Sequence, residues 1–264
     1  MADFSAKDVQ ALRQAMGVGM MDAKRALTEN GGDIEAAKRW LREKGMAKAE
    51  ERADRSSSQG AVAVARDGNV AALVALRCET DFVAKSPEFT ALADELAKLV
   101  LAKGEAAVAE RQDEVDTLRL KLKENISVGE VHRFEAPDGS VLDAYLHIQN
   151  GRGVNGILVE VAGGTEAQAH EVALNVAFHK PQWLRREDVP AERVADERQT
   201  LENLTRNEGK PEAAVPKIVE GRLGGFFKEH TLVEQPYVRD PKLSISQFLG
   251  HASVTRYAQV VIGQ

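Results

Sequence analysis

The sequence holds a single cysteine, Cys78, in 264 residues. One cysteine excludes an intramolecular disulfide and any metal site built from several cysteines. Aromatic residues make up only 5% of the chain, and the formal net charge is -6. The chain therefore lacks both the stacking platforms and the overall positive potential that bind nucleic acid. We expect no direct nucleic-acid partner.

Long apolar runs are missing as well. No run approaches the roughly 20 residues that cross a bilayer, and the first residues, MADFSAKDVQ, lack the apolar core of a signal peptide. These absences predict a cytoplasmic protein without a membrane partner. The histidines show no metal-ligand spacing, and neither a phosphate-binding loop motif nor a constellation of nucleophile, acid and base is present. We therefore expect no metal, no cofactor and no enzyme.

The first 46 residues carry the pattern of three short amphipathic helices. Ser5 and Asp8 have the spacing of a capping box at the start of the first helix. We predict a compact three-helix unit over residues 1–46. The charged and then serine-rich stretch that follows has no apolar period, so residues 47–59 are predicted to be a linker.

From Gly60 onwards the apolar residues alternate, which predicts two strands joined by a tight turn at Asp67 to Asn69. A helix with Pro87 in its first turn and a charged helix over residues 108–126 are expected next. A second pair of strands, from Val141, has a glycine-rich turn and is again followed by a helix. The pattern predicts a core with a duplicated antiparallel hairpin and helix, in the ranges 60–138 and 139–189, the second completed by about 231–264.

Residues 190–230 predict an inserted antiparallel helical hairpin. Val194, Leu201 and Leu204 form a narrow seam at the spacing of a short coiled coil. A short C-terminal helical module is expected at 240–252, followed by a strand, VTRYAQVVIG, that closes a sheet of the core. The fold class predicted for the whole chain is a multidomain α+β protein.

The stretch RCETDFVAKSPEF allows two interpretations. An apolar strand stops at Glu79, and the bulky Phe82 then stands beside Asp81 at the start of a helix. In the first interpretation Asp81 caps the helix and Phe82 packs beneath it as a hydrophobic staple, which is the commoner arrangement. In the second, Phe82 is a wedge that enters another protein.

Three sequence motifs that occur in a fixed order along the chain are specific enough to distinguish one protein family from many others. GVGMMDAKRAL, CETDFVAKSPEF and FFKEHTLVEQPYVRDP together closely resemble bacterial elongation factor Ts, the nucleotide exchange factor of the GTPase elongation factor Tu. The resemblance covers nearly the whole chain, and its first unit is similar to a ubiquitin-associated-like domain. It implies a guanine-nucleotide exchange factor of translation elongation that binds elongation factor Tu in its GDP-bound and nucleotide-free forms.

The resemblance also implies which residues bind the partner. A loop is expected to enter the GTPase domain near its magnesium and phosphate site and to dislocate the magnesium ion; it comprises Thr80, Asp81, Phe82 and Val83. A second set, in the three-helix unit, is expected to face the same domain; it comprises Val18, Met20, Met21 and Lys24.

Two questions stay open at this level. A non-catalytic adaptor that binds some other protein through the three-helix unit is the alternative function, and it does not need the loop around Phe82. A homodimer through the helical hairpin or through the core is compatible with the pattern.

Overall fold

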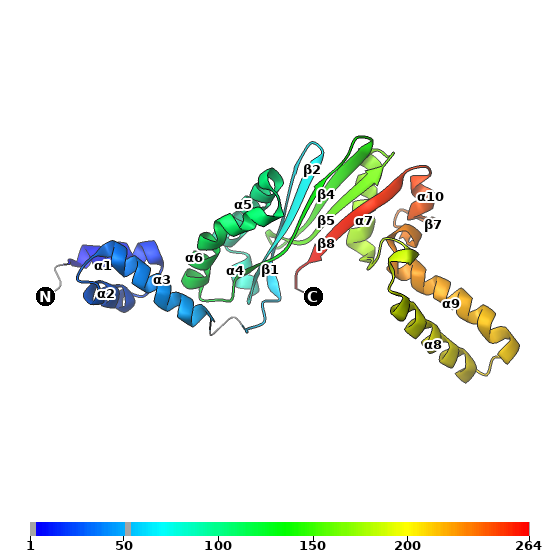
Figure 1. The fold of residues 1–264 in the computed structure, drawn as a ribbon, viewed down its shortest axis with the longest axis horizontal. Coiled ribbons are helices and arrows are strands. Elements are labelled where there is room, and N and C mark those ends of the chain that lie inside the picture. Colours follow the sequence, from blue (N-terminus) through cyan, green and yellow to red (C-terminus); the bar gives the residue numbers. More distant parts are fainter. Residues whose placement is uncertain (1–3, 51–53, 264) are drawn as a thin grey trace.

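The computed structural model describes residues 4–50 and 54–263, with the backbone alone at 46–50. The molecule is elongated: three helices lie at one end, two sheets in the middle and a helical hairpin at the other end (Figure 1). Helices and antiparallel strands are both abundant, which confirms the predicted α+β class. In the part of the chain that is described, no helix is both long and apolar enough to span a bilayer.

The N-terminal helices are α1 (Ala6–Met16), α2 (Met20–Glu29) and α3 (Ile34–Glu50). The predicted capping box is confirmed, because the Ser5 hydroxyl accepts from the Asp8 amide and the Asp8 carboxylate accepts from the Ser5 amide. Gly17 ends α1 in the left-handed conformation, with φ 62°. The three helices share one apolar core, formed by Val9, Leu12, Ala23, Ala26, Leu27, Ala37 and Leu41.

Helix α3 continues to Glu50, past the predicted start of the linker at residue 47. The stretch MAKAE consists of strong helix formers, so nothing in it ends the helix. The helix also packs on α6 (Gln112–Leu122) of the core: a Cβ on Gly45 would lie 2.3 Å from Leu120 Cδ2. Arg42 Nη1 lies 3.9 Å from Asp113 Oδ2. The three-helix unit therefore rests on the core in addition to being tethered to it.

The first sheet has the strand order β1-β2-β3, all antiparallel. Its strands are β1 (Gln59–Asp67), β2 (Val70–Cys78) and β3 (Ser127–Glu135). The tight turn predicted between the first two strands is confirmed by the pairing of Asp67 with Val70.

Strand β3 was not predicted, because its apolar residues do not alternate. Val128 and Val131, three positions apart, both pack on the same side, against the core beneath α5. A bulge in β3 makes this possible: the two steps from Val74 to Leu76 on β2 are matched by three steps from Val131 to Val128, and the extra residue resets which face each residue occupies. A pattern of period 2 cannot reveal such a strand.

The second sheet has the order β4-β5-β8 and is also antiparallel. Its strands are β4 (Ser140–Gln149), β5 (Arg152–Ala162) and β8 (Ser253–Val261), so the C-terminal strand closes the sheet as expected. The glycine-rich stretch NGRGVNG is only partly a turn. A Cβ on Gly153 would lie 2.1 Å from the carbonyl oxygen of Val62, and one on Gly156 would lie 2.5 Å from the Val62 side chain. These two glycines let the sheets approach.

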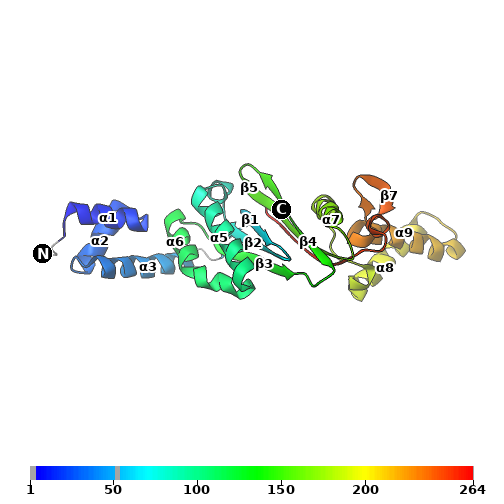
Figure 2. The ribbon, with the colours of Figure 1, turned by 90° about the horizontal axis from the view of Figure 1, so that it is seen from above.

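The two sheets pack face to face through an apolar layer that includes Val62, Leu73, Leu142 and Leu158. Helix α5 (Pro87–Lys103) covers the outer face of the first sheet, and α7 (Glu166–His179) covers that of the second. Seen from above, the order is helix, sheet, sheet, helix, with α6 between α5 and the three-helix unit (Figure 2).

The charged helix predicted over 108–126 is shorter than expected. A 3-10 helix, η1 (Glu105–Arg111), precedes α6, which ends at Leu122 because Lys123 adopts φ 58°. The chain then turns so that Ile126, fully buried, enters the core. Apolar anchoring of Ile126 thus overrides the helix propensity of the preceding residues.

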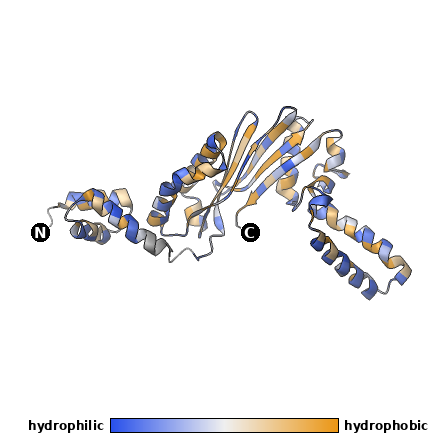
Figure 3. Ribbon diagram, in the orientation of Figure 1, coloured by the Kyte–Doolittle hydropathy of each residue, from blue (hydrophilic) through white to orange (hydrophobic). Residues whose placement is uncertain are grey.

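The helical hairpin consists of α8 (Ala191–Asn207) and α9 (Val215–His230), which pack on each other. Val194 and Leu201 lie in the seam as predicted, but Leu204 does not: it is 48% exposed, and Thr205 is buried in its place. The Thr205 hydroxyl donates to the Leu201 carbonyl and accepts from Arg222, so a polar residue is satisfied inside the seam. Figure 3 shows that α8 is largely hydrophilic, in contrast to the strands of the core.

The C-terminal segment differs from the predicted helical module at 240–252. A small antiparallel ribbon, β6 (Pro236–Tyr237) and β7 (Asp240–Ser244), comes first. Helix α10 (Ile245–Leu249) follows and has only five residues, with Ser244 and Gln247 forming a capping box at its start. Ile245 and Leu249 attach it to the core beneath the second sheet.

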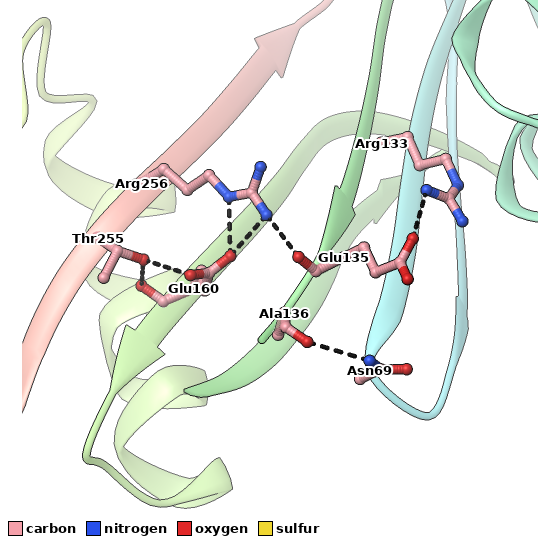
Figure 4. Close-up of polar contacts among 7 residues, drawn as sticks. All are labelled: Asn69, Arg133, Glu135, Ala136, Glu160, Thr255 and Arg256. Carbon is pink, nitrogen blue, oxygen red and sulfur yellow. Dashed lines mark hydrogen bonds and ion pairs between the residues drawn. The ribbon is translucent and has the colours of Figure 1, made fainter. Parts of the chain in front are cut away.

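Arg256, held in an ion pair with Glu160 inside the second sheet, links the two sheets at the edges formed by β3 and β8 (Figure 4). Glu160, only 4% exposed, accepts from Arg256 Nε at 2.8 Å and from the Thr255 hydroxyl at 2.8 Å. Arg256 in turn donates to the carbonyl oxygen of Glu135 on the other sheet and lies over the Phe134 ring at 4.3 Å. Arg256 is therefore the residue that joins the buried carboxylate to the opposite sheet.

We predict that Arg256→Ala lowers the free energy of unfolding by about 3 kcal/mol, because it leaves Glu160 buried without its cation. Arg198→Ala removes an exposed pair with Glu220 and should cost only about 0–1 kcal/mol. Urea unfolding of both variants measures the difference. Equal losses would show that the pair of Arg256 with the buried Glu160 contributes no more than a surface pair.

Candidate functional site

The loop around Phe82 leaves the first sheet at the end of its central strand. We call residues 79–83 the Phe82 loop. Strand β2 ends at Cys78, and a one-turn helix, α4 (Asp81–Ala84), begins after two intervening residues. Thr80 is its N-cap, since the Thr80 hydroxyl accepts from the Val83 amide at 3.3 Å. Ala84 is fully buried and Val83 packs on the core beneath α5, so the helix is seated firmly.

Phe82 is 83% exposed, the highest value among the exposed large apolar side chains of the described residues. The staple interpretation is therefore wrong: the ring does not pack under α5. Leaving such a ring in water forgoes roughly 1.5–3 kcal/mol of burial free energy. An aromatic side chain held outward on an ordered turn is an arrangement that suits contact with a partner.

Asp81 does not cap the helix either, because Thr80 fills that role. The Asp81 carboxylate forms an ion pair with Lys85, one turn later. The hydrogen bond from Lys85 lowers the pKa of Asp81, so the carboxylate is ionised at neutral pH. The Phe82 loop thus offers an exposed ring beside a fixed negative charge.

Glu124 holds the Phe82 loop from a distant part of the chain, the turn between α6 and β3. Its carboxylate accepts from the amides of Glu79 and Thr80, at 3.0 and 3.1 Å, and from the Thr80 hydroxyl at 2.6 Å. In return, the Glu79 carboxylate accepts from the Asn125 amide at 2.7 Å. Reasoning from the sequence missed Glu124, since 44 residues separate it from Thr80 and no local pattern connects them.

The candidate residues of the three-helix unit lie at the start of α2. Met21 is 73% exposed, Met20 is 47% exposed and Lys24 is also exposed. Val18 is half-buried and packs on the core of the unit, so it contributes less surface than the two methionines. Met20 and Met21 together present a flexible apolar surface.

The two sets of candidate residues belong to different parts of the molecule. The methionines stand on the three-helix unit, and the Phe82 loop stands on the core. Helix α6 connects the parts, because α3 packs on it while the turn that follows it, between α6 and β3, supplies Glu124. The structure therefore links both sets of residues through one helix.

Grooves also lie elsewhere on the described part of the chain. One, of about 840 Å³, is bounded by the end of α7, by α9 and by the segment from β6 to α10, and Phe178 stands beside it, 70% exposed. Another, of about 600 Å³, lies between β3, β8 and residues 181–188. Within the described ranges, no group of three or more histidine, cysteine, aspartate or glutamate side chains is placed to hold a metal ion.

Known proteins of several bacteria resemble this chain over its length. The protein named Elongation factor Ts of Leifsonia xyli subsp. xyli is 41% identical over 273 residues, covering 97% of this chain and 96% of that protein. Those of Streptomyces coelicolor and Micrococcus luteus are 42% and 39% identical, and each match covers 100% of both chains. The family described as Elongation factor TS matches residues 79–264.

These matches define a translation elongation factor. The chain belongs to the elongation factor Ts family, the nucleotide exchange factors of elongation factor Tu. The resemblance carried by the three sequence motifs is thereby confirmed. Which residues perform the exchange in this chain is a separate question, because similarity over the whole length assigns no role to any one side chain.

Cys78 gives a test of how firmly the Phe82 loop covers the core. Its side chain is fully buried and its thiol donates to the carbonyl of Thr80. Burial raises the pKa of Cys78 from 9.0 to about 12. At pH 8 only about one thiol in ten thousand is then ionised, and the thiolate is the reactive form.

We predict that Cys78 of the native protein does not react within minutes with a thiol-specific disulfide reagent at pH 8. When the chain is unfolded in guanidinium, Cys78 should react with one equivalent of the reagent. Because the pKa is higher in the folded state, the stability contributed by the protonated thiol is complete below pH 9 and declines between pH 9 and 12. Fast labelling of the native protein at pH 8 would mean that the loop opens readily.

Proposed function

We propose that this chain releases GDP from elongation factor Tu by inserting the Phe82 loop into the GTPase domain, near the magnesium and phosphate site. The observation that carries the proposal is the exposure of Phe82, 83%, on a turn that is otherwise seated in the core. Thr80 shapes the turn, Phe82 is the wedge, Val83 anchors the helix, and Asp81 supplies negative charge.

The physical reason for the release lies in how a GTPase holds its nucleotide. Backbone amides of a phosphate loop and a bound magnesium ion make the main contacts that bind the diphosphate. A ring that displaces side chains at this site, with a carboxylate beside the magnesium ion, weakens both. Exchange then needs no covalent chemistry by this chain and no cofactor.

Exchange is driven by differential binding. The chain must bind the nucleotide-free partner more tightly than the GDP-bound partner, since only a difference in affinity can shift the equilibrium. Reciprocity then requires that GDP or GTP weakens the hold of this chain on elongation factor Tu by the same factor. GTP binding thereby completes the cycle and sets the factor free.

The start of α2 supplies a second contact in this proposal. Met20 and Met21 are exposed and adaptable, and Lys24, one turn further along α2, adds a positive charge. Val18 supports them from the core of the unit. A contact outside the nucleotide site provides affinity that does not depend on which nucleotide is bound, so it recruits the partner while the Phe82 loop discriminates.

The remaining parts of the chain are assigned in the same proposal. We infer three functional parts, namely the three-helix unit, the core of two hairpin-and-helix halves, and the inserted helical hairpin. The setting is the cytoplasm, without nucleic acid as a direct partner. The oligomeric state in this proposal is a homodimer, formed through the hairpin or through the core. In the hairpin, Leu204 of α8 is 48% exposed and would provide an apolar contact.

The test is release of a fluorescent GDP analogue from elongation factor Tu, followed by stopped flow. Phe82→Ala should slow release at least about tenfold, a loss of about 1.4 kcal/mol. Because the ring is exposed, its removal should change the free energy of unfolding by less than about 0.5 kcal/mol.

Phe178→Ala is the matched control, because it removes another exposed phenylalanine, 70% exposed at the end of α7. It should leave release unchanged. A stable Phe82→Ala protein with normal release would contradict the wedge. If the wild-type chain itself gave no acceleration at stoichiometric amounts, the adaptor through the three-helix unit would be the better reading.

A shortened helical hairpin tests whether the hairpin takes part in exchange. Replacing residues 201–219 by a short turn keeps the base of the hairpin, where Leu223, Phe226 and Phe227 pack on Val189. We predict release within about threefold of the wild type, since the tip projects away from the Phe82 loop (Figure 1). Sedimentation of both proteins shows whether the tip supports a dimer. Loss of release in a folded protein would make the tip a contact surface for elongation factor Tu.

A further inference from the structure

Glu124 makes more hydrogen bonds to the Phe82 loop than any side chain within the loop does. Oε2 accepts from the amides of Glu79 and Thr80, and Oε1 accepts from the Thr80 hydroxyl. These two amides stand where β2 has ended and α4 has not begun, so neither strand nor helix supplies their acceptor. One distant carboxylate thus supplies the hydrogen-bond acceptor for both backbone amides.

The Thr80 hydroxyl passes this restraint on to α4. It donates to Glu124 Oε1 at 2.6 Å and accepts from the Val83 amide at 3.3 Å, so the carboxylate fixes the orientation of the N-cap. A helix of four residues has no stability of its own. An N-cap contributes about 1 kcal/mol. Glu124 therefore stabilises the turn that carries Phe82.

Glu124 is itself held in place on both sides. Lys123, just before Glu124, ends α6 in the left-handed conformation, and the fully buried Ile126 anchors the chain two residues after Glu124. Arg119 of α6 donates twice to the Ile126 carbonyl, at 2.9 and 2.6 Å. The Asn125 amide donates to the Glu79 carboxylate, which closes a reciprocal pair of contacts between the two turns. The turn that carries Glu124 is therefore itself fixed to the core.

We infer that Glu124 is a positioning residue for nucleotide exchange: it pre-orders the Phe82 loop so that the ring meets the GTPase already in its binding conformation. This inference rests on the proposed function of Phe82. Fixing the backbone of one residue costs roughly 1–2 kcal/mol of conformational entropy. When the loop is already ordered in the free protein, binding to the partner does not lose this free energy. Glu124 itself does not need to touch elongation factor Tu.

The first measurement is release of the fluorescent GDP analogue by Glu124→Ala, Glu124→Gln and Glu110→Ala. Glu110 pairs with Lys103 away from the loop, so its variant matches the loss of charge. Glu124→Ala should weaken apparent affinity for elongation factor Tu about tenfold, equal to about 1.4 kcal/mol. Glu124→Gln, whose carbonyl oxygen still accepts from the two amides, should stay within about threefold of wild type. Glu110→Ala should behave as wild type.

The second measurement separates positioning from a general effect on the fold. If Glu124 acts through the ring, its removal should add little once Phe82 is already alanine, so the double variant should be no more than about twofold slower than Phe82→Ala. Hydrogen exchange at the amides of Thr80 and Val83 should be faster in Glu124→Ala than in wild type, with the strands of the core unchanged.

Each other outcome overturns the inference. Additive losses in the double variant would mean that Glu124 acts independently of Phe82. A Glu124→Gln protein as impaired as Glu124→Ala would show that accepting from the two amides does not carry the effect, and unchanged hydrogen exchange would show that no ordering is lost. Failure of the proposed function is distinguishable: Phe82→Ala would then release GDP as fast as wild type, and the positioning role would fall with it.

Discussion

The packing of the two three-stranded sheets on each other is the constraint on which the rest of the structure depends. The inner faces meet through Val62, Leu73 and Leu158, and Gly153 and Gly156 allow β5 to approach β1 more closely than any side chain would permit. Once the sheets are paired, each has only its outer face left to cover, which α5 and α7 do. The end of β2 is thereby fixed in space, and with it the origin of the Phe82 loop.

The Phe82 loop combines two properties that normally oppose each other. A large apolar ring exposed to water favours collapse onto a nearby apolar surface, and its neighbour Val83 already packs on the core beneath α5. The ring stays outward because the backbone on both sides of it is fixed. Val83 and Ala84 pack on the core, and Thr80 is hydrogen-bonded to Glu124. The exposure of the ring, which we propose to be a contact for elongation factor Tu, is thus maintained by the packing and hydrogen bonds of its neighbours.

Helix α6 relates the three-helix unit to this surface. It receives α3 on one side, through Leu120 and the Arg42–Asp113 pair, and ends in the turn that carries Glu124. A factor that grips one GTPase at two places gains affinity from the second contact only when the geometry lets both engage together. Because α6 packs on α3 and leads into the turn that carries Glu124, one helix couples the positions of the two proposed contacts.

What the sequence determined by itself is local: the capping box of Ser5 and Asp8, the tight turn after Asp67, and three motifs specific enough to identify the family. Such features depend on contacts between residues a few positions apart, which a pattern can display. The tertiary structure alone decided that β3 exists, that Thr205 replaces Leu204 in the hairpin seam and that Glu124 holds the Phe82 loop. It also decided that Phe82 faces water, since that depends on how neighbouring side chains fill the core. These outcomes rest on a bulge, a satisfied buried hydroxyl and a carboxylate 44 residues from its partner, and contacts between residues so far apart along the chain leave no periodic trace in it.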